Sequence, residues 1–130
     1  MNRRRVLTLS SSLLFLAGCV GTTDAAKLAR IELANERSSR VSISLSVVDA
    51  GSSVYSNEFA VPAKTGDEQP PQVVVSDALP DSPGEYVVRY TVNEFPTETF
   101  DVASNVLTDC TKLRLTIREE FTELTYSNGC

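Results

Sequence analysis

Histidine and tryptophan are absent from this chain of 130 residues, and cysteine occurs only three times. The absence of histidine removes the commonest general base and the commonest metal ligand of proteins. Without histidine, a serine or cysteine nucleophile has no imidazole to activate it. The three cysteines have no CxxC spacing, which disfavours a zinc or redox site. An enzyme is therefore the least supported class of function, and the sequence implies no cofactor.

Long apolar runs and basic patches are lacking as well. The uncharged segment 6–17 would span about 18 Å as a helix, which is short of the roughly 30 Å hydrocarbon core of a membrane. Acidic residues outnumber basic ones by 17 to 12, for a net charge of −5 at pH 7. Because a surface of this sign repels phosphate backbones, we expect no nucleic-acid partner.

The N-terminal residues have the three parts of an export signal. Arg3, Arg4 and Arg5 supply a positive start, segment 6–17 is uncharged and apolar, and small residues stand just before Cys19. Such a segment does not belong to the folded domain of the mature protein. We therefore expect a signal peptide over 1–18 and a short polar tether over 19–26.

The tetrad Leu16-Ala17-Gly18-Cys19 resembles the lipobox of lipoprotein signal peptides at all four positions. The resemblance implies that the thiol of Cys19 receives a lipid and that cleavage just before it makes Cys19 the mature N-terminus. The alternative is a short signal anchor in which Cys19 is an ordinary buried residue.

The arginines at 3–5, followed by apolar residues, also look like a twin-arginine export signal, although Asn2 stands where serine or threonine is usual. A simple basic region for the general export route is the alternative.

The chain is acidic and has nine arginines but only three lysines. This composition suits a protein from a salt-rich environment, where salt screens the repulsion between like charges on the protein. An ordinary surface charge that keeps the protein in solution is the alternative explanation. Together with the lipobox, these features resemble small surface lipoproteins of halophilic archaea. That resemblance implies a lipid-anchored position at the outer face of the cytoplasmic membrane.

From residue 27 onward, apolar and polar side chains alternate with a period of two, and turn residues interrupt the pattern repeatedly. No long segment has the 3.6-residue period of a helix. The pattern predicts an all-β domain over 27–130: an immunoglobulin-like antiparallel β-sandwich of about 7–8 strands, with a small antiparallel β-barrel as the alternative. The expected strands are 28–33, 40–49, 54–61, 72–76, 85–92, 95–102, 111–118 and 121–126.

Two of these strands have the clearest core faces. In 40–49 the apolar residues at 41, 43, 45 and 47 alternate with serines, and in 85–92 the apolar residues are at 86, 88, 90 and 92. The turn Pro83-Gly84 followed by Tyr86 resembles the Pro-Gly-x-Tyr start of a strand in immunoglobulin-like and fibronectin-type modules. In 95–102, Pro96 favours a position at the edge of a sheet.

The two remaining cysteines, Cys110 and Cys130, are expected to form a disulfide, because exported domains tend to pair spare thiols. Matching the apolar residues of the final hairpin puts Ile117 opposite Thr122 or Leu124. Either register brings the two cysteines to within one residue of each other across the ladder, so an irregular strand end is also required.

Acidic side chains offer one weak candidate for a metal site. Asp77, Asp81 and Glu85 are spaced four apart around a turn, and calcium requires several converging oxygen ligands. Separate surface acids explain the same spacing, so we expect no metal. The acidic pairs at 67–68 and 119–120 are expected to be solvated turn charges.

Two classes of function stay open. The leading hypothesis is a non-catalytic binding or interaction module at the cell surface, with a protein or glycan partner. The alternative is a structural or stress-protective envelope component without a specific ligand. A binding module should show an exposed aromatic or apolar patch on one sheet or loop end, whereas a uniformly acidic surface without such a patch argues against it.

The lipid anchor can be tested by replacing Cys19 with serine in the full chain expressed in its native host. The wild-type protein should fractionate with membranes, and the Cys19→Ser variant should lose the lipid and with it stable attachment. Cys110→Ser is the control and should stay in the membrane fraction. A Cys19→Ser protein that is cleaved yet still bound to membranes contradicts the lipid anchor.

Overall fold

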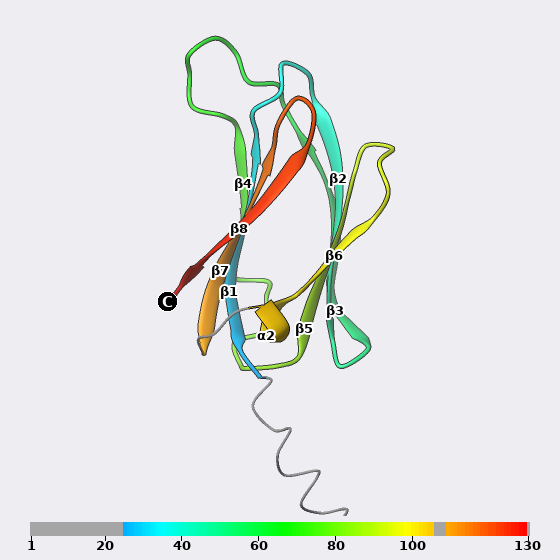
Figure 1. Ribbon diagram of the computed structural model, residues 1–130, viewed down its shortest axis with the longest axis vertical. Coiled ribbons are helices and arrows are strands. Elements are labelled where there is room, and N and C mark those ends of the chain that lie inside the picture. The colour runs from blue at the N-terminus through cyan, green and yellow to red at the C-terminus, as the bar shows by residue number, and fades with distance from the viewer. Residues whose placement is uncertain (1–24, 106–108, 130) are drawn as a thin grey trace, which may run out of the picture.

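The computed structural model describes residues 25–105 and 109–129. These residues form two β-sheets packed face to face (Figure 1). The strands are β1 (Lys27–Asn35), β2 (Val41–Asp49), β3 (Ser52–Val61), β4 (Gln72–Val75), β5 (Tyr86–Val92), β6 (Glu98–Asp101), β7 (Cys110–Ile117) and β8 (Thr122–Asn128). A single helical turn, α2 (Val102–Asn105), follows β6 in the described part of the chain.

The strands divide equally between the two sheets. One sheet has the order β4-β1-β7-β8 and the other the order β3-β2-β5-β6. The predicted β-sandwich is therefore confirmed, and within the described residues the sheets do not close into the alternative barrel. In the constant-type immunoglobulin arrangement the first two strands share a sheet, whereas here β1 and β2 lie in different sheets.

The prediction of an antiparallel sandwich needs one correction, which concerns β1. This strand runs parallel to β7, with Ile31 opposite Leu113 and Leu33 opposite Leu115, while the other strand pairs are antiparallel. Side chains alternate in the same way in parallel and antiparallel strands, so the sequence pattern does not reveal strand direction. Within its sheet, β1 is an interior strand that lies between β4 and β7.

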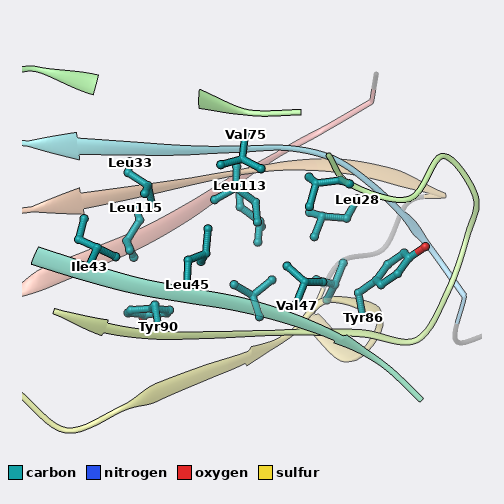
Figure 2. Packing of buried hydrophobic residues seen from close by; sticks show 14 of the residues in the cluster. Leu28, Leu33, Ile43, Leu45, Val47, Val75, Tyr86, Tyr90, Leu113 and Leu115 are labelled. Atoms are coloured by element: carbon teal, nitrogen blue, oxygen red, sulfur yellow. The ribbon is translucent and has the colours of Figure 1, made fainter. Parts of the chain in front are cut away.

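The expected core faces are confirmed. The apolar residues of β2 and β5 point between the sheets, and the serines of β2 lie on the outer face. The core combines these residues with apolar side chains of β1 and β7 from the opposite sheet (Figure 2). Burying a side chain of this size contributes about 1.5–3 kcal/mol. The largest fully buried side chains are Tyr86, Leu28, Ile31, Leu33, Ile43, Leu45, Leu113, Leu115 and Ile117.

The clearest difference from the expected strand boundaries lies at β6, which begins at Glu98 instead of residue 95. Asn93 adopts a positive φ of 50°, and the N–H of Phe95 donates to the carbonyl of Val92 at 3.0 Å, so the chain is still turning. Pro96 then has no N–H to offer a ladder. Consequently Phe95 belongs to the β5–β6 loop. The predicted edge position is confirmed, because β6 is the last strand of its sheet.

The Pro-Gly-x-Tyr segment is held by a close approach of Gly84 to its neighbours. A Cβ at position 84 would lie 2.7 Å from the Tyr86 ring and 3.0 Å from the carboxylate of Asp49. The buried Tyr86 donates its hydroxyl hydrogen to the carbonyl of Ser82 at 2.6 Å. Glycine is therefore required here by space, and it lets the turn pack tightly against the first large aromatic residue of β5.

The final hairpin adopts one of the two predicted registers, with Ile117 opposite Thr122. The N–H of Gly129 donates to the carbonyl of Cys110 at 2.9 Å, so Gly129 is held beside the start of β7. Cys130 lies outside the described residues, and the Cys110–Cys130 disulfide therefore stays a prediction.

At the loop end of β1, the side chain of Asn35 is fully buried and ties three segments together. Its amide nitrogen donates to the carbonyls of Ser39 (3.0 Å), Val61 (3.3 Å) and Pro62 (2.8 Å). Its side-chain oxygen accepts the N–H of Arg37 at 2.9 Å. Because buried backbone groups need partners, this one side chain fixes the β1–β2 loop against the end of β3.

Replacing Asn35 with alanine should lower the free energy of unfolding by about 3 kcal/mol, because several buried backbone groups lose their partner at once. Urea unfolding of the full chain measures this change. Ser39→Ala is the matched control: it keeps the carbonyl that Asn35 binds and should change stability by no more than about 0.5 kcal/mol. Equal stability of the two variants contradicts the role given to Asn35.

Candidate functional site

Several residues singled out in the sequence lie where the structure makes no statement. The signal peptide 1–18 with Arg3, Arg4 and Arg5, the lipid-attachment candidate Cys19, and Cys130 are outside the described residues. Within the described part, no helix is long or apolar enough to span a bilayer.

The three calcium candidates are not brought together as a site. Asp81 forms an ion pair with Lys27, and that interaction lowers the pKa of Asp81 through a hydrogen bond first and the lysine's charge second. Asp77 and Glu85 are exposed. Among residues 25–105 and 109–129, no three acidic, histidine or cysteine side chains are grouped so that they could hold a metal ion.

The candidate site is a pocket of about 350 Å³ at one end of the sandwich. It lies at the tips of the β5–β6 and β7–β8 hairpins, opposite the end where β1 begins (Figure 1). We call it the distal pocket. Its lining comes from both sheets and comprises Arg37, Tyr90, Val92, Phe95, Pro96, Glu98, Ile117, Arg118, Glu119, Glu120, Phe121 and Thr122.

Two phenylalanines give the distal pocket an exposed aromatic rim. Phe95 is 57% exposed and Phe121 is 58% exposed, although phenylalanine is usually buried. The other exposed large apolar residues of the described chain, Val54, Val74 and Tyr126, are not part of the pocket lining. The exposed aromatic patch expected of a binding module is therefore present at a loop end.

Tight turns explain why the two rings face solvent. In the β7–β8 hairpin, the N–H of Arg118 donates to the carbonyl of Phe121 at 2.8 Å, which leaves only the two glutamates at 119–120 in the loop. In the β5–β6 loop, the side-chain oxygen of Asn93 accepts the N–H of Ser42 at 2.9 Å. Both loops are thus held by hydrogen bonds to strand ends, and their phenylalanines project from fixed backbone.

Sequence reasoning missed this site because it assigned both phenylalanines to strands. Phe95 was expected to begin 95–102 and Phe121 to begin 121–126, where each would take a place in the alternation. The available signal was local: each phenylalanine directly follows acidic residues in a turn, at 94 and at 119–120. An aromatic residue at such a turn is a candidate for display.

The acidic pair at 119–120, expected to be only solvated, contributes to the site through Glu119. Its carboxylate accepts the N–H of Ser38 at 2.9 Å and lies 3.8 Å from Nε of Arg37. The hydrogen bond from Ser38 lowers the pKa of Glu119 below its ordinary value, and the charge of Arg37 adds to the shift. Glu119 therefore joins the β7–β8 hairpin to the β1–β2 loop.

Arg118, the second cation of the pocket, is held by two carboxylates outside it. Its guanidinium donates to Glu123 at 3.0 Å and to Glu36 at 3.4 Å. The hydrogen bond with Glu123, followed by the charge of Glu36, raises the pKa of Arg118. Both arginines of the distal pocket are consequently close to carboxylates, and neither presents an uncompensated positive charge.

Polar groups without partners also line the distal pocket. Tyr90 is only 9% exposed, and no described residue hydrogen-bonds its hydroxyl. Nε of Arg37 is buried without a hydrogen-bond acceptor, since Glu119 lies beyond hydrogen-bonding distance. Burial first, and the nearby charge of Glu98 second, raise the pKa of Tyr90, so its hydroxyl stays protonated and able to donate.

Comparison with known proteins identifies no family. No protein family model matches the chain, and no curated protein matches it. Among the solved structures that are similar is a protein from Bacteroides ovatus, described as a candidate cell adhesion protein. The two share 11% identity with a TM-score of 0.38, over 78% of this chain and 44% of that chain. The chain thus spans less than half of that protein. What defines it is the fold and the site: a β-sandwich with an aromatic-rimmed pocket at its loop end.

Tyr90 should ionise at a higher pH than the ordinary tyrosine value of 10.0. Because the folded state holds this proton more tightly than the unfolded state, stability is unaffected below pH 10 and should fall as the pH rises above it. An NMR titration of labelled tyrosine carbons measures the shift, with Tyr90→Phe identifying the resonance. Ionisation of Tyr90 at or below the ordinary value contradicts the desolvation of this side chain in the folded state.

Proposed function

We propose that this chain is an exported, lipid-anchored protein that displays a non-catalytic binding module at the cell surface. Cys19 carries the lipid, residues 19–26 form the tether, and the β-sandwich binds a surface partner through the distal pocket. The observation that supports binding most directly is the pair of exposed rings, Phe95 and Phe121, on neighbouring hairpins that line one pocket.

The position of the pocket suits a module anchored by its N-terminal end. Fully extended, residues 19–26 span at most about 28 Å, and the nine residues of β1 add roughly 30 Å of sandwich height. β1 begins at one end of the sandwich and the distal pocket lies at the other (Figure 1). A lipid on Cys19 would therefore leave the pocket facing away from the membrane.

The chemistry of the pocket favours binding over catalysis. Its lining has no serine, cysteine or histidine to act as a nucleophile or imidazole base. A glycosidase would need a carboxyl group whose pKa is raised so that it can act as the acid, whereas the pKa of Glu119 is lowered. A structural or stress-protective envelope component, the alternative, would have no need of exposed rings at the end of its hairpins.

Replacing Phe95 or Phe121 with alanine should weaken binding of the detergent-solubilised full chain to isolated envelope of its host by about ten-fold or more, equivalent to about 1.4 kcal/mol. A pelleting assay with labelled protein measures this. Because both rings are more than half exposed, thermal stability should change little.

Tyr126→Ala is the matched control, since Tyr126 is an exposed aromatic residue (46%) outside the pocket lining. It should keep wild-type affinity. If the wild-type chain does not bind envelope, or if all three variants bind equally well, the binding module is wrong and the structural alternative is favoured.

A further inference from the structure

We infer that the distal pocket takes a neutral sugar unit of a surface glycan. This inference rests on the proposed binding function and names the chemical class of its ligand. It is drawn from four properties of the pocket: its exposed rings, its unpartnered hydroxyl, its balance of charge and its size.

The rings supply the apolar half of a sugar site. A pyranose ring has a face of C–H groups, which packs on the negative face of an aromatic ring. Phe95 and Phe121 offer two such rings, and Pro96 and Val92 add apolar surface to the same lining. Because these rings stand on loops fixed by hydrogen bonds, little conformational freedom is lost when a ligand packs on them.

The polar half comes from Tyr90 and the glutamates. Tyr90 lies on the pocket lining with nine-tenths of its surface buried, and its hydroxyl, which stays open to solvent, has no partner among the described residues. A hydroxyl held at the wall of a pocket and free of protein partners can donate to a ligand oxygen in place of water. Glu98 and Glu120 on the same lining can in turn accept from ligand hydroxyls. Sugar hydroxyls both donate and accept, so one ligand satisfies both kinds of group.

The charge of the pocket favours a neutral ligand over an anionic one. Three glutamates oppose two arginines on the lining, and the arginines already lie beside carboxylates. An acidic peptide, a phosphate or a uronic acid would meet a net negative site on a chain of charge −5. A neutral sugar avoids this repulsion.

The size of the pocket agrees with a single ligand unit in preference to a protein surface. Its volume of about 350 Å³ is at the lower end of the range of roughly 300–1,000 Å³ for small-molecule sites. A stable protein partner would need to bury at least about 1,000 Å² in total. A pocket of this volume suits one sugar residue, with the rest of the glycan outside it.

The test uses full-length protein and host envelope that has been treated in one of two ways. Periodate, which oxidises sugars with vicinal diols, should abolish binding, and protease treatment should leave it intact. Binding that survives periodate but is lost with protease overturns the glycan ligand while the binding module stands. Binding that survives both treatments also overturns it. Absence of binding to untreated envelope instead contradicts the proposed function itself.

Competition identifies the charge of the ligand. Glycans released from the envelope and separated by anion exchange should compete in the neutral fraction and not in the acidic one; the reverse result overturns the neutral sugar. In the same assay Tyr90→Phe, which keeps the ring and removes only the hydroxyl, should require about ten-fold more of the neutral fraction to saturate. Tyr126→Ala should match the wild type. An unchanged affinity of Tyr90→Phe refutes the role assigned to the hydroxyl.

Discussion

The parallel pairing of β1 with β7 is the interaction on which the rest of the sandwich depends. It inserts the first strand between β4 and β7, so that Ile31 and Leu33 stand beside Leu113 and Leu115 in one apolar layer. The same register brings opposite charges together on the outer face, where Arg114 donates to Glu32 at 3.1 Å. Without this pairing, β4 and β1 would be separated from β7 and β8, and the core of the other sheet would lose its continuous cover.

The pairing also determines the geometry of the distal pocket. It ends where the N–H of Glu36 donates to the carbonyl of Ile117 at 2.9 Å, which places the β1–β2 loop beside the β7–β8 hairpin. Asn35 then fixes that loop from inside, and Glu119 holds it from outside. A rigid frame of this kind lets loop residues serve as a binding surface, because their positions do not depend on the ligand.

The exposed phenylalanines show how local backbone constraints can override hydrophobic preference. Leaving such a ring in water forgoes about 1.5–3 kcal/mol relative to burial. Phe95 stays outside the core because Asn93 turns the chain and Pro96 prevents the strand from starting earlier. Phe121 stays outside because it closes the β7–β8 turn. A stability cost retained at two adjacent loops is consistent with use of the surface they form.

By itself, the sequence determined the all-β class and the strands, and it favoured the two-layer sandwich over a barrel. Alternation with a period of two identified all eight described strands and the inward faces of β2 and β5, because burial follows directly from that period. The tertiary structure decided the parallel direction of β1, the β6 boundary, and the meeting of Tyr90, Phe95 and Phe121 around one pocket. These depend on pairings between residues far apart in the chain, and alternation within a strand carries no information about its neighbours.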